Sequence, residues 1–554
     1  MISVIFIWLY MLFTCYLTGF LCVKVISGNG KFKFKRETDY FYAGIGAVTV
    51  YAQIFSIFGK VGLLANVILL IACILICVWL RRELAERFRA LRLTVTPGRT
   101  AMALLLFLAF AYGTSRGYIH YDTGLYHAQS IRWIEEYGVV PGLGNLHSRL
   151  AYNSSAFCLS ALYSMAFLGG RSYHCCAGFL AFLLSLVCSE MIRKGFFQNP
   201  RLSDFARIIG IYYLLNIFDE MISPASDYFM VLLVLFIVIR WLELLERKEK
   251  SFFPYAMLSV MCVVVISVKL SGALTLLLAL LPAVQMVREK RVIEIFKFIG
   301  TGILVIAPFL IRNVILSGWL IYPFTAVDLF DVDFKIPKGM AEYDAREIQV
   351  WGRGYSDVTL YGQPIVKWMP EWIRGLGGVD TVFLALAVSG TLLFLWFAGY
   401  ALWKKKKEML AYLHAAGTLT ICFLFWLFSA PLIRYGCVFL WLVPVVTWGY
   451  LYLKISPHMD RFRVYGVFIL LAGVYKAGAF GTEQCRLASA DYLILQKDYD
   501  RYETESYELH GYTFYYSPSG DRTGYDAFPA SPVKAEDIFR GETIEEGFKD
   551  VIHS

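Results

Sequence analysis

The chain has 554 residues, of which 58% are hydrophobic, 17% are aromatic and only 17% are charged, and its formal net charge is +9. Soluble domains average about 45–50% apolar and about 25% charged residues, so this composition excludes a soluble multidomain enzyme, a disordered chain and a collagen-like repeat. The apolar residues cluster into runs close to the ~20 residues that a helix needs to cross a bilayer. We therefore predict an all-α, polytopic bundle of transmembrane helices.

In chain order, these runs predict about 14 crossings, within a range of about 13–15, and place both termini on one side of the membrane. The predicted spans lie near residues 2–22, 41–58, 61–80, 99–113, 173–192, 205–218, 226–245, 252–268, 271–287, 295–314, 380–402, 409–428, 432–453 and 463–479.

One further apolar run, 152–168, does not fit this alternation. It is interrupted by Asn153 and by serines, and it ends at Gly169 and Gly170. The segment after Gly113 is expected outside and the basic pair Arg193-Lys194 inside, so the number of crossings between them must be odd. We therefore expect this run to lie in the interface, or to re-enter the membrane, without crossing it.

Basic residues gather in short connectors, and such connectors stay on the cytoplasmic side. Because whole spans separate these clusters, we expect no nucleic-acid partner. The clusters are Lys31 to Arg36, Arg81 to Arg92, Arg193-Lys194, Arg247 to Lys250, Arg288 to Arg291, Lys404 to Lys407, and Arg461 with Arg463.

The chain divides into three parts. Residues 1–98 form additional N-terminal helices, 99–480 form the main transmembrane region, and 481–554 form a tail with seven Lys and Arg against fifteen Asp and Glu. The loops 114–172 and 315–379 fall on the same, outer side as the tail. The tail is too aromatic for a disordered acidic segment, and we expect it to pack on the outer face.

The loop 114–172 carries the first group of reactive side chains. Tyr126 and Gln129 follow Asp122 by four and seven residues, so the three share one face of a short helix that Gly138 ends. Asp122 can cap this helix, or it can accept a hydroxyl proton as a general base. With it, His120 and His127 are candidates for holding a divalent metal ion, although their spacing matches no standard site.

A second acid, Asp227, follows Ser226 at the start of a predicted span. It either caps that helix or serves a site on the same side as Asp122.

Three cations, Lys269, Arg312 and Arg434, lie at outer ends of spans, against the usual charge distribution. Their side chains either reach lipid headgroups or converge on a phosphate, for which arginine offers a two-pronged donor. The absence of a GxxxxGK[ST] or GxGxxG motif from the sequence means that an enzyme of this layout would take its activated substrate from the membrane.

An acid-bearing, aromatic outer loop after an early span, an interfacial helix and a second acidic turn together resemble the GT-C superfamily of membrane glycosyltransferases. The resemblance covers about residues 100–450. More narrowly, a set of short motifs resembles a group of largely uncharacterised bacterial integral membrane proteins that is associated with cell-surface polysaccharide. These motifs are Arg312-Asn313, Ser317-Gly318, Tyr322-Pro323, Gly520 to Arg522, Pro529, Arg540-Gly541 and Gly547-Phe548.

The resemblance implies an enzyme of the bacterial inner membrane whose active site faces outward. It would move a sugar from a polyprenyl-phosphate donor to a hydroxyl of a glycan or lipid acceptor. Asp122 would deprotonate the acceptor, and the leaving phosphate would be stabilised by cations. The residues expected to bind the substrates are Tyr126, Asp227, Lys269, Arg312, Arg434 and Tyr435.

Two alternatives stay open. A lipid-linked polysaccharide polymerase or ligase would use the loop 315–379 with Arg346 and Arg353. A lipid or solute transporter, including a flippase, would need charges near span midpoints and matched halves. The tryptophans of the loop 315–379 either stack on sugars or anchor the loop at the membrane interface. They are Trp319, Trp351, Trp368 and Trp372.

Overall fold

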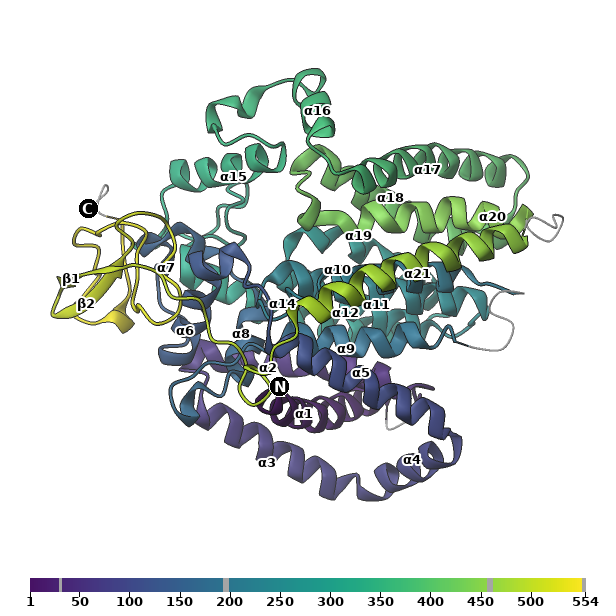
Figure 1. Cartoon of the computed structure of the whole chain (residues 1–554), viewed down its shortest axis with the longest axis horizontal. Helices are drawn as coiled ribbons and strands as arrows, with labels where there is room; N and C mark the ends of the chain where they lie inside the picture. The colour runs from purple at the N-terminus through teal and green to yellow at the C-terminus, as the bar shows by residue number, and fades with distance from the viewer. Residues whose placement is uncertain (29–31, 193–198, 456–461, 551–554) are drawn as a thin grey trace.

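The computed structural model of the chain describes residues 1–28, 32–192, 199–455 and 462–550. The basic residues Lys31, Arg193, Lys194 and Arg461 lie outside these residues. Helices make up most of the fold, and many of the long ones run roughly along its longest dimension (Figure 1), which confirms the predicted all-α bundle.

The helices have the following bounds: α1 (Ile2–Ile26), α2 (Glu37–Phe58), α3 (Leu63–Trp79), α4 (Arg81–Thr94), α5 (Pro97–Ser115), α6 (Ala128–Glu136), α7 (Leu143–Leu146), α8 (Ser155–Tyr163), α9 (Cys176–Ser189), α10 (Leu202–Asn216), α11 (Ser226–Glu246), α12 (Phe252–Val268), α13 (Leu280–Arg288), α14 (Val292–Ser317), α15 (Lys338–Gly352), α16 (Ile365–Arg374), α17 (Gly378–Trp403), α18 (Leu410–Ser429), α19 (Ile433–Pro444), α20 (Tyr450–Ile455) and α21 (Phe462–Leu487).

Within the described residues, eight helical segments are long and apolar enough to cross a membrane, or nine if the pair α3 and α4, bent by 79°, is one span. This number is below the predicted crossings because several apolar runs form shorter helices. For example, α9, α10 and α12 have 14, 15 and 17 residues. Helices of that length rise about 21–26 Å, less than the ~30 Å of a hydrocarbon core.

The apolar run 152–168 forms only the nine-residue helix α8, followed by a short 3₁₀ turn. Such a helix rises about 13 Å, less than the ~30 Å of a hydrocarbon core, which fits the prediction that this run does not cross. All nine residues are buried, and α8 packs against α2 and α6. It therefore lies inside the protein and does not rest on a lipid-facing surface.

The centre of the bundle is α11, which packs against α9, α10, α12 and α19. In its most apolar stretch 89% of residues are buried, compared with 22% for α17. A helix that is apolar on all sides is typical of a core position. Since α11 runs through the bundle, it carries Asp227 at one end, and Arg240 and Glu243 about 20 Å along its axis.

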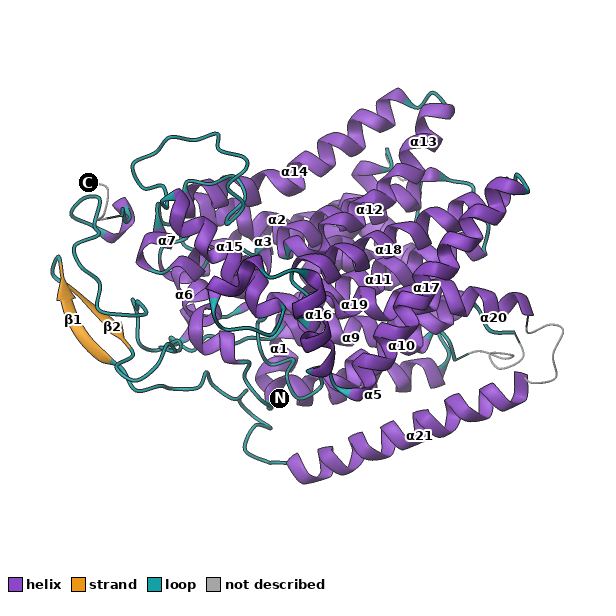
Figure 2. Cartoon of the chain, turned by 90° about the horizontal axis from the view of Figure 1, so that it is seen from above, coloured by secondary structure: helices purple, strands orange, loops and turns teal. Residues whose placement is uncertain are grey.

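The tail packs on one end of the bundle, as predicted. Its antiparallel hairpin, β1 (Glu505–Leu509) and β2 (Tyr512–Tyr516), lies beside α6 and α7 (Figures 1 and 2). Buried aromatic side chains join the tail to the loop 114–172, among them Trp133, Phe514, Phe539 and Phe548. We call this end, which also carries α15, the loop end. The connectors around α4 and α13 lie at the opposite end.

Candidate functional site

A cavity of about 1200 Å³, including its open mouth, lies at the loop end. Its walls come from the segment before α6, the junction after α12, and α14, α15, α18 and α19. The structure brings five of the predicted site residues to this cavity: Asp122, Tyr126, Lys269, Arg434 and Tyr435.

Asp122 stands in the first turn of a helix that passes through a π-helical turn, Thr123–His127, into α6. Its side chain makes no capping hydrogen bond, so helix capping does not account for it. Instead its Oδ2 forms an ion pair with Nη2 of Arg434 at 2.8 Å. Asp122 is therefore held as an ion-paired carboxylate on the cavity wall.

The π-helical turn also corrects the predicted helix face. A π turn holds an extra residue, so four- and seven-residue spacings no longer align across it. Tyr126 remains at the cavity with Asp122, but Gln129 points to the tail, where its Nε2 donates to the carbonyls of Gly524 and Ala527 at 2.8 and 2.7 Å. The helix ends before Gly138, as predicted.

Asp227 lies in the first turn of α11 and forms an ion pair with Lys269 at the end of α12. The ammonium of Lys269 also lies 4.3 Å from the ring centroid of Tyr435. Both charges suit their helix ends, because a helix dipole favours an acid at the first turn and a cation at the last. Asp227 thus does not line the cavity, but it holds Lys269, which does.

Arg434 has the opposite relation to its helix. It lies in the first turn of α19, where the dipole disfavours a cation. Its charge is balanced by Asp122, and its Nη1 donates to Nε2 of His120 at 2.7 Å. Its buried Nε has no acceptor among the described residues. Local helix energetics do not explain this arginine, which suggests a role in the cavity.

The two histidines are held as neutral rings. Both ring nitrogens of His120 face donors: Nη1 of Arg434 lies 2.7 Å from Nε2, and the backbone N–H of Asp122 points to Nδ1 at 3.1 Å, while Nδ1 lies 4.0 Å from Oδ2 of Asp122. Burial lowers the pKa of His120, and burial lowers that of His127 far more. Nδ1 of His127 lies 3.2 Å from the Thr123 hydroxyl.

These side chains do not fit a metal ion. Across the described ranges, no three His, Cys, Asp or Glu residues converge on a common point. Nη1 of Arg434 lies against Nε2 of His120. A cation in that position occupies the nitrogen lone pair that a metal ion would need. We therefore derive no step through a metal.

Arg312 lies behind the cavity wall. Its Nη1 donates to the Ser56 hydroxyl at 2.5 Å and its Nε to Oδ1 of Asn153 at 3.3 Å. Successive residues on a helix point about 100° apart, so Asn313 lines the cavity while Arg312 faces α2. Arg312 positions Asn153, which does line the cavity.

A second wall of the cavity, not predicted from the sequence, is made of aromatic and polar residues: Arg149, Tyr152, Asn153, Asn313 and Tyr322. The guanidinium of Arg149 lies 4.6 Å from the ring centroid of Trp351 and 3.5 Å from Glu347. Arg149 lies in the loop 114–172, which is predicted to be on the same side as the tail. A cation on that side is the signal by which the sequence could have revealed it.

Of the tryptophans in the loop 315–379, Trp351 lines the cavity, Trp372 lines a neighbouring hollow, and Trp319 and Trp368 are buried elsewhere. A second hollow of about 1180 Å³ shares Trp351 and Arg434 with the first and includes Arg353. Arg346 lies outside both hollows and pairs with Glu342 at 3.6 Å.

The apolar helices and their arrangement define a multi-pass membrane protein. The chain belongs to a family known only as a domain of unknown function, DUF8201, whose model matches residues 1–441. That match includes every residue at the loop-end cavity and excludes α20, α21 and the tail. No curated protein and no solved structure matches the chain.

Proposed function

We propose that the loop-end cavity transfers a sugar from a polyprenyl-phosphate donor to an acceptor hydroxyl. The observation that carries this proposal is the meeting of Asp122, Arg434 and Lys269 in one cavity. A carboxylate beside two cations provides the two functions that this reaction needs, a proton acceptor and a binding site for the leaving phosphate.

The reaction balances with these groups. The acceptor oxygen forms a bond to the anomeric carbon, and the bond from that carbon to the phosphate oxygen breaks. The electron pair stays with the phosphate, and the acceptor proton moves to Asp122. Arg434 and Lys269 stabilise the charge that develops on the phosphate, and cations already in place lower the barrier to its formation.

The ion pair between Asp122 and Arg434 gives the order of events. A carboxylate that shares its charge with a guanidinium is a weak base. A donor phosphate at Arg434 competes with Asp122 for the same donors, and the free Nε offers it a further one. Donor binding therefore frees the Asp122 carboxylate from Arg434 at the moment when the acceptor must be deprotonated.

The second wall suits the sugar. Aromatic faces such as those of Trp351 and Tyr152 can lie against sugar rings, and the amides of Asn153 and Asn313 can bind hydroxyls. The neighbouring hollow, separated by Arg434 and Trp351, provides an approach for a glycan or lipid acceptor.

We place the protein in a bacterial inner membrane with the loop end outward. The support for this orientation is the basic connectors around α4 and α13 at the opposite end, because such connectors stay cytoplasmic. The expected activity belongs to the synthesis of cell-surface polysaccharide or glycoconjugate.

The test is a transfer assay in membranes with a panel of labelled polyprenyl-phosphate sugars. The proposal expects release of polyprenyl phosphate and a labelled acceptor with at least one donor, and loss of both in the Asp122→Asn variant. Growth of a polymer from lipid-linked oligosaccharides, without monosaccharide transfer, would instead establish the polymerase. Equal turnover by the variant and the unchanged protein would refute the role of Asp122.

A further inference from the structure

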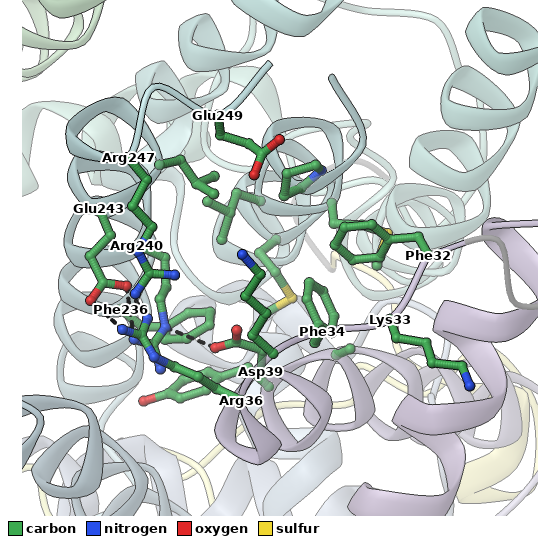
Figure 3. A pocket seen from close by; sticks show the side chains of 18 residues that line it. Phe32, Lys33, Phe34, Arg36, Asp39, Phe236, Arg240, Glu243, Arg247 and Glu249 are labelled. Atoms are coloured by element: carbon green, nitrogen blue, oxygen red, sulfur yellow. Dashed lines mark hydrogen bonds and ion pairs between the residues drawn. The ribbon is translucent and has the colours of Figure 1, made fainter. Parts of the chain in front are cut away.

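Another cavity, open to solvent at its mouth, lies between the start of α2, the end of α11 and the start of α12, at the opposite end from the candidate active site (Figure 3). Its volume is about 760 Å³ including the mouth. Five cations and three carboxylates line it, together with apolar side chains. The proposed transfer reaction makes no use of this cavity.

Most of the charge at its back wall is already paired. The guanidinium of Arg240 contacts Asp39 at 2.8 Å, Glu190 at 2.8 Å and Glu243 at 3.0 Å. Arg36 bonds Glu190 at 2.8 Å and also Glu243. Figure 3 shows Arg240 joined to Asp39 and Glu243. These two arginines are neutralised and form a rigid wall.

Two cations are left over. Among the residues that the structure describes, neither Lys35 nor Arg247 has a carboxylate within ion-pair distance. Burial, with Arg36 nearby, lowers the pKa of Arg247. Lys33, by contrast, extends away from the paired charges in Figure 3. Glu249 also lines the cavity, so it has no large excess of charge, but Lys35 and Arg247 are two exposed cations that no described carboxylate holds and that an anion would pair with.

The remaining walls are apolar. Phe34, Phe236, Pro254, Met257 and Leu258 line the cavity, and Phe32 packs against Phe253 with ring centroids 4.5 Å apart. A small hydrated anion would gain nothing from these walls. A ligand that joins a phosphate to a hydrocarbon chain matches both parts.

We propose that this cavity binds one anionic phospholipid, with the phosphate at Arg247 and Lys35 and the upper acyl chain against Met257 and Leu258. Basic pockets between membrane helices recognise such headgroups. The paired wall of Arg240 excludes a second anion and fixes the depth at which the phosphate stops. Since the cavity shares no residue with the loop-end site, this binding is independent of the proposed transferase activity.

The experiment uses the purified full chain and compares phosphatidylglycerol, phosphatidylcholine with the same acyl chains, and inorganic phosphate. We expect phosphatidylglycerol alone to raise the melting temperature, and native mass spectrometry to show one lipid retained. A shift of equal size with phosphatidylcholine, or with inorganic phosphate at the same concentration, would overturn the proposal.

Variants locate the site. Arg247→Gln and Lys35→Gln should each weaken retention of phosphatidylglycerol about tenfold or more, as expected for the loss of a hydrogen bond between charged groups. The matched control is Lys250→Gln, which removes the same charge from the same connector outside the cavity. Met257→Phe narrows the apolar part of the cavity. It should weaken retention of phosphatidylglycerol, while the melting temperature measured in phosphatidylcholine stays unchanged. Equal retention by the Arg247, Lys35 and Lys250 variants would refute the site.

Discussion

Nη2 of Arg434 lies 2.8 Å from Oδ2 of Asp122, and this contact joins the first turn of α19 to the helix that follows α5. Neither residue satisfies a local need of its own helix: Asp122 caps nothing, and Arg434 stands at the disfavoured helix end. Their pairing is the clearest sign that tertiary structure has assembled a site here. It also supplies the first two predictions.

Replacing Asp122 by Asn should abolish sugar transfer while the protein still inserts and folds. The amide keeps the shape of the side chain but cannot accept the acceptor proton, and loss of a general base lowers rates by about 10²–10⁴-fold. The rate is measured in membranes that contain equal amounts of each variant. The control is Asp526→Asn, an exposed tail carboxylate paired with Arg501, which should leave the rate unchanged.

Arg434→Lys should reduce turnover and weaken donor binding together, because lysine keeps the charge but loses the planar two-pronged donor. Arg434→Gln should reduce both further, since it also leaves Asp122 without its partner. KM for the donor and kcat are measured separately. The exposed Arg486, which pairs with Glu483 at 2.6 Å, provides the control Arg486→Gln. A change in acceptor KM alone would contradict the phosphate assignment.

The docking of the tail should weaken as pH rises through neutrality. Glu135 on α6 accepts from the hydroxyls of Ser172 and Tyr525, and burial raises its pKa from 4.5 to about 7. A raised carboxyl pKa contributes stability below the unfolded value that is lost as pH rises through the folded value. Between pH 6 and pH 8 this amounts to about 1 kcal/mol.

Limited proteolysis of the tail at pH 6 and pH 8 measures this effect. Cleavage near the hairpin should be faster at pH 8, and Glu135→Gln, which stays neutral, should remove the difference. A difference that persists in this variant would assign the pH dependence to another group.

Removing Arg240 should destabilise the whole bundle. Its guanidinium is buried and contacts Asp39, Glu190 and Glu243. Arg36 still pairs with Glu190 and Glu243, but Arg240→Ala leaves Asp39 without a cation, and breaking such a pair costs about 3–5 kcal/mol. The exposed pair of Arg486 and Glu483 should contribute little to stability, because water screens it. Thermal unfolding of the two variants in the same detergent checks the contrast. Similar melting temperatures would show that the network is dispensable.

Some features follow from composition and periodicity alone. Long apolar runs predict helices, and the serine-rich run 152–168 is recognisable as one that does not cross, because polar side chains are costly in hydrocarbon. Cations at the outer ends of predicted spans also mark much of the site, because a cation at an apolar boundary needs an anionic or polar partner. Lys269 and Arg434 met that expectation at the cavity.

Other features depend on contacts that no local pattern encodes. One extra residue in a π turn moved Gln129 from the cavity to the tail, and a rotation of about 100° between neighbours put Asn313 at the cavity and Arg312 behind it. Pattern and charge thus predict which segments enter the membrane and which side chains need partners. The packing of α11, α12 and α19 selects the partners, because hydrogen bonds and ion pairs depend on distances of a few ångströms between residues far apart in the chain.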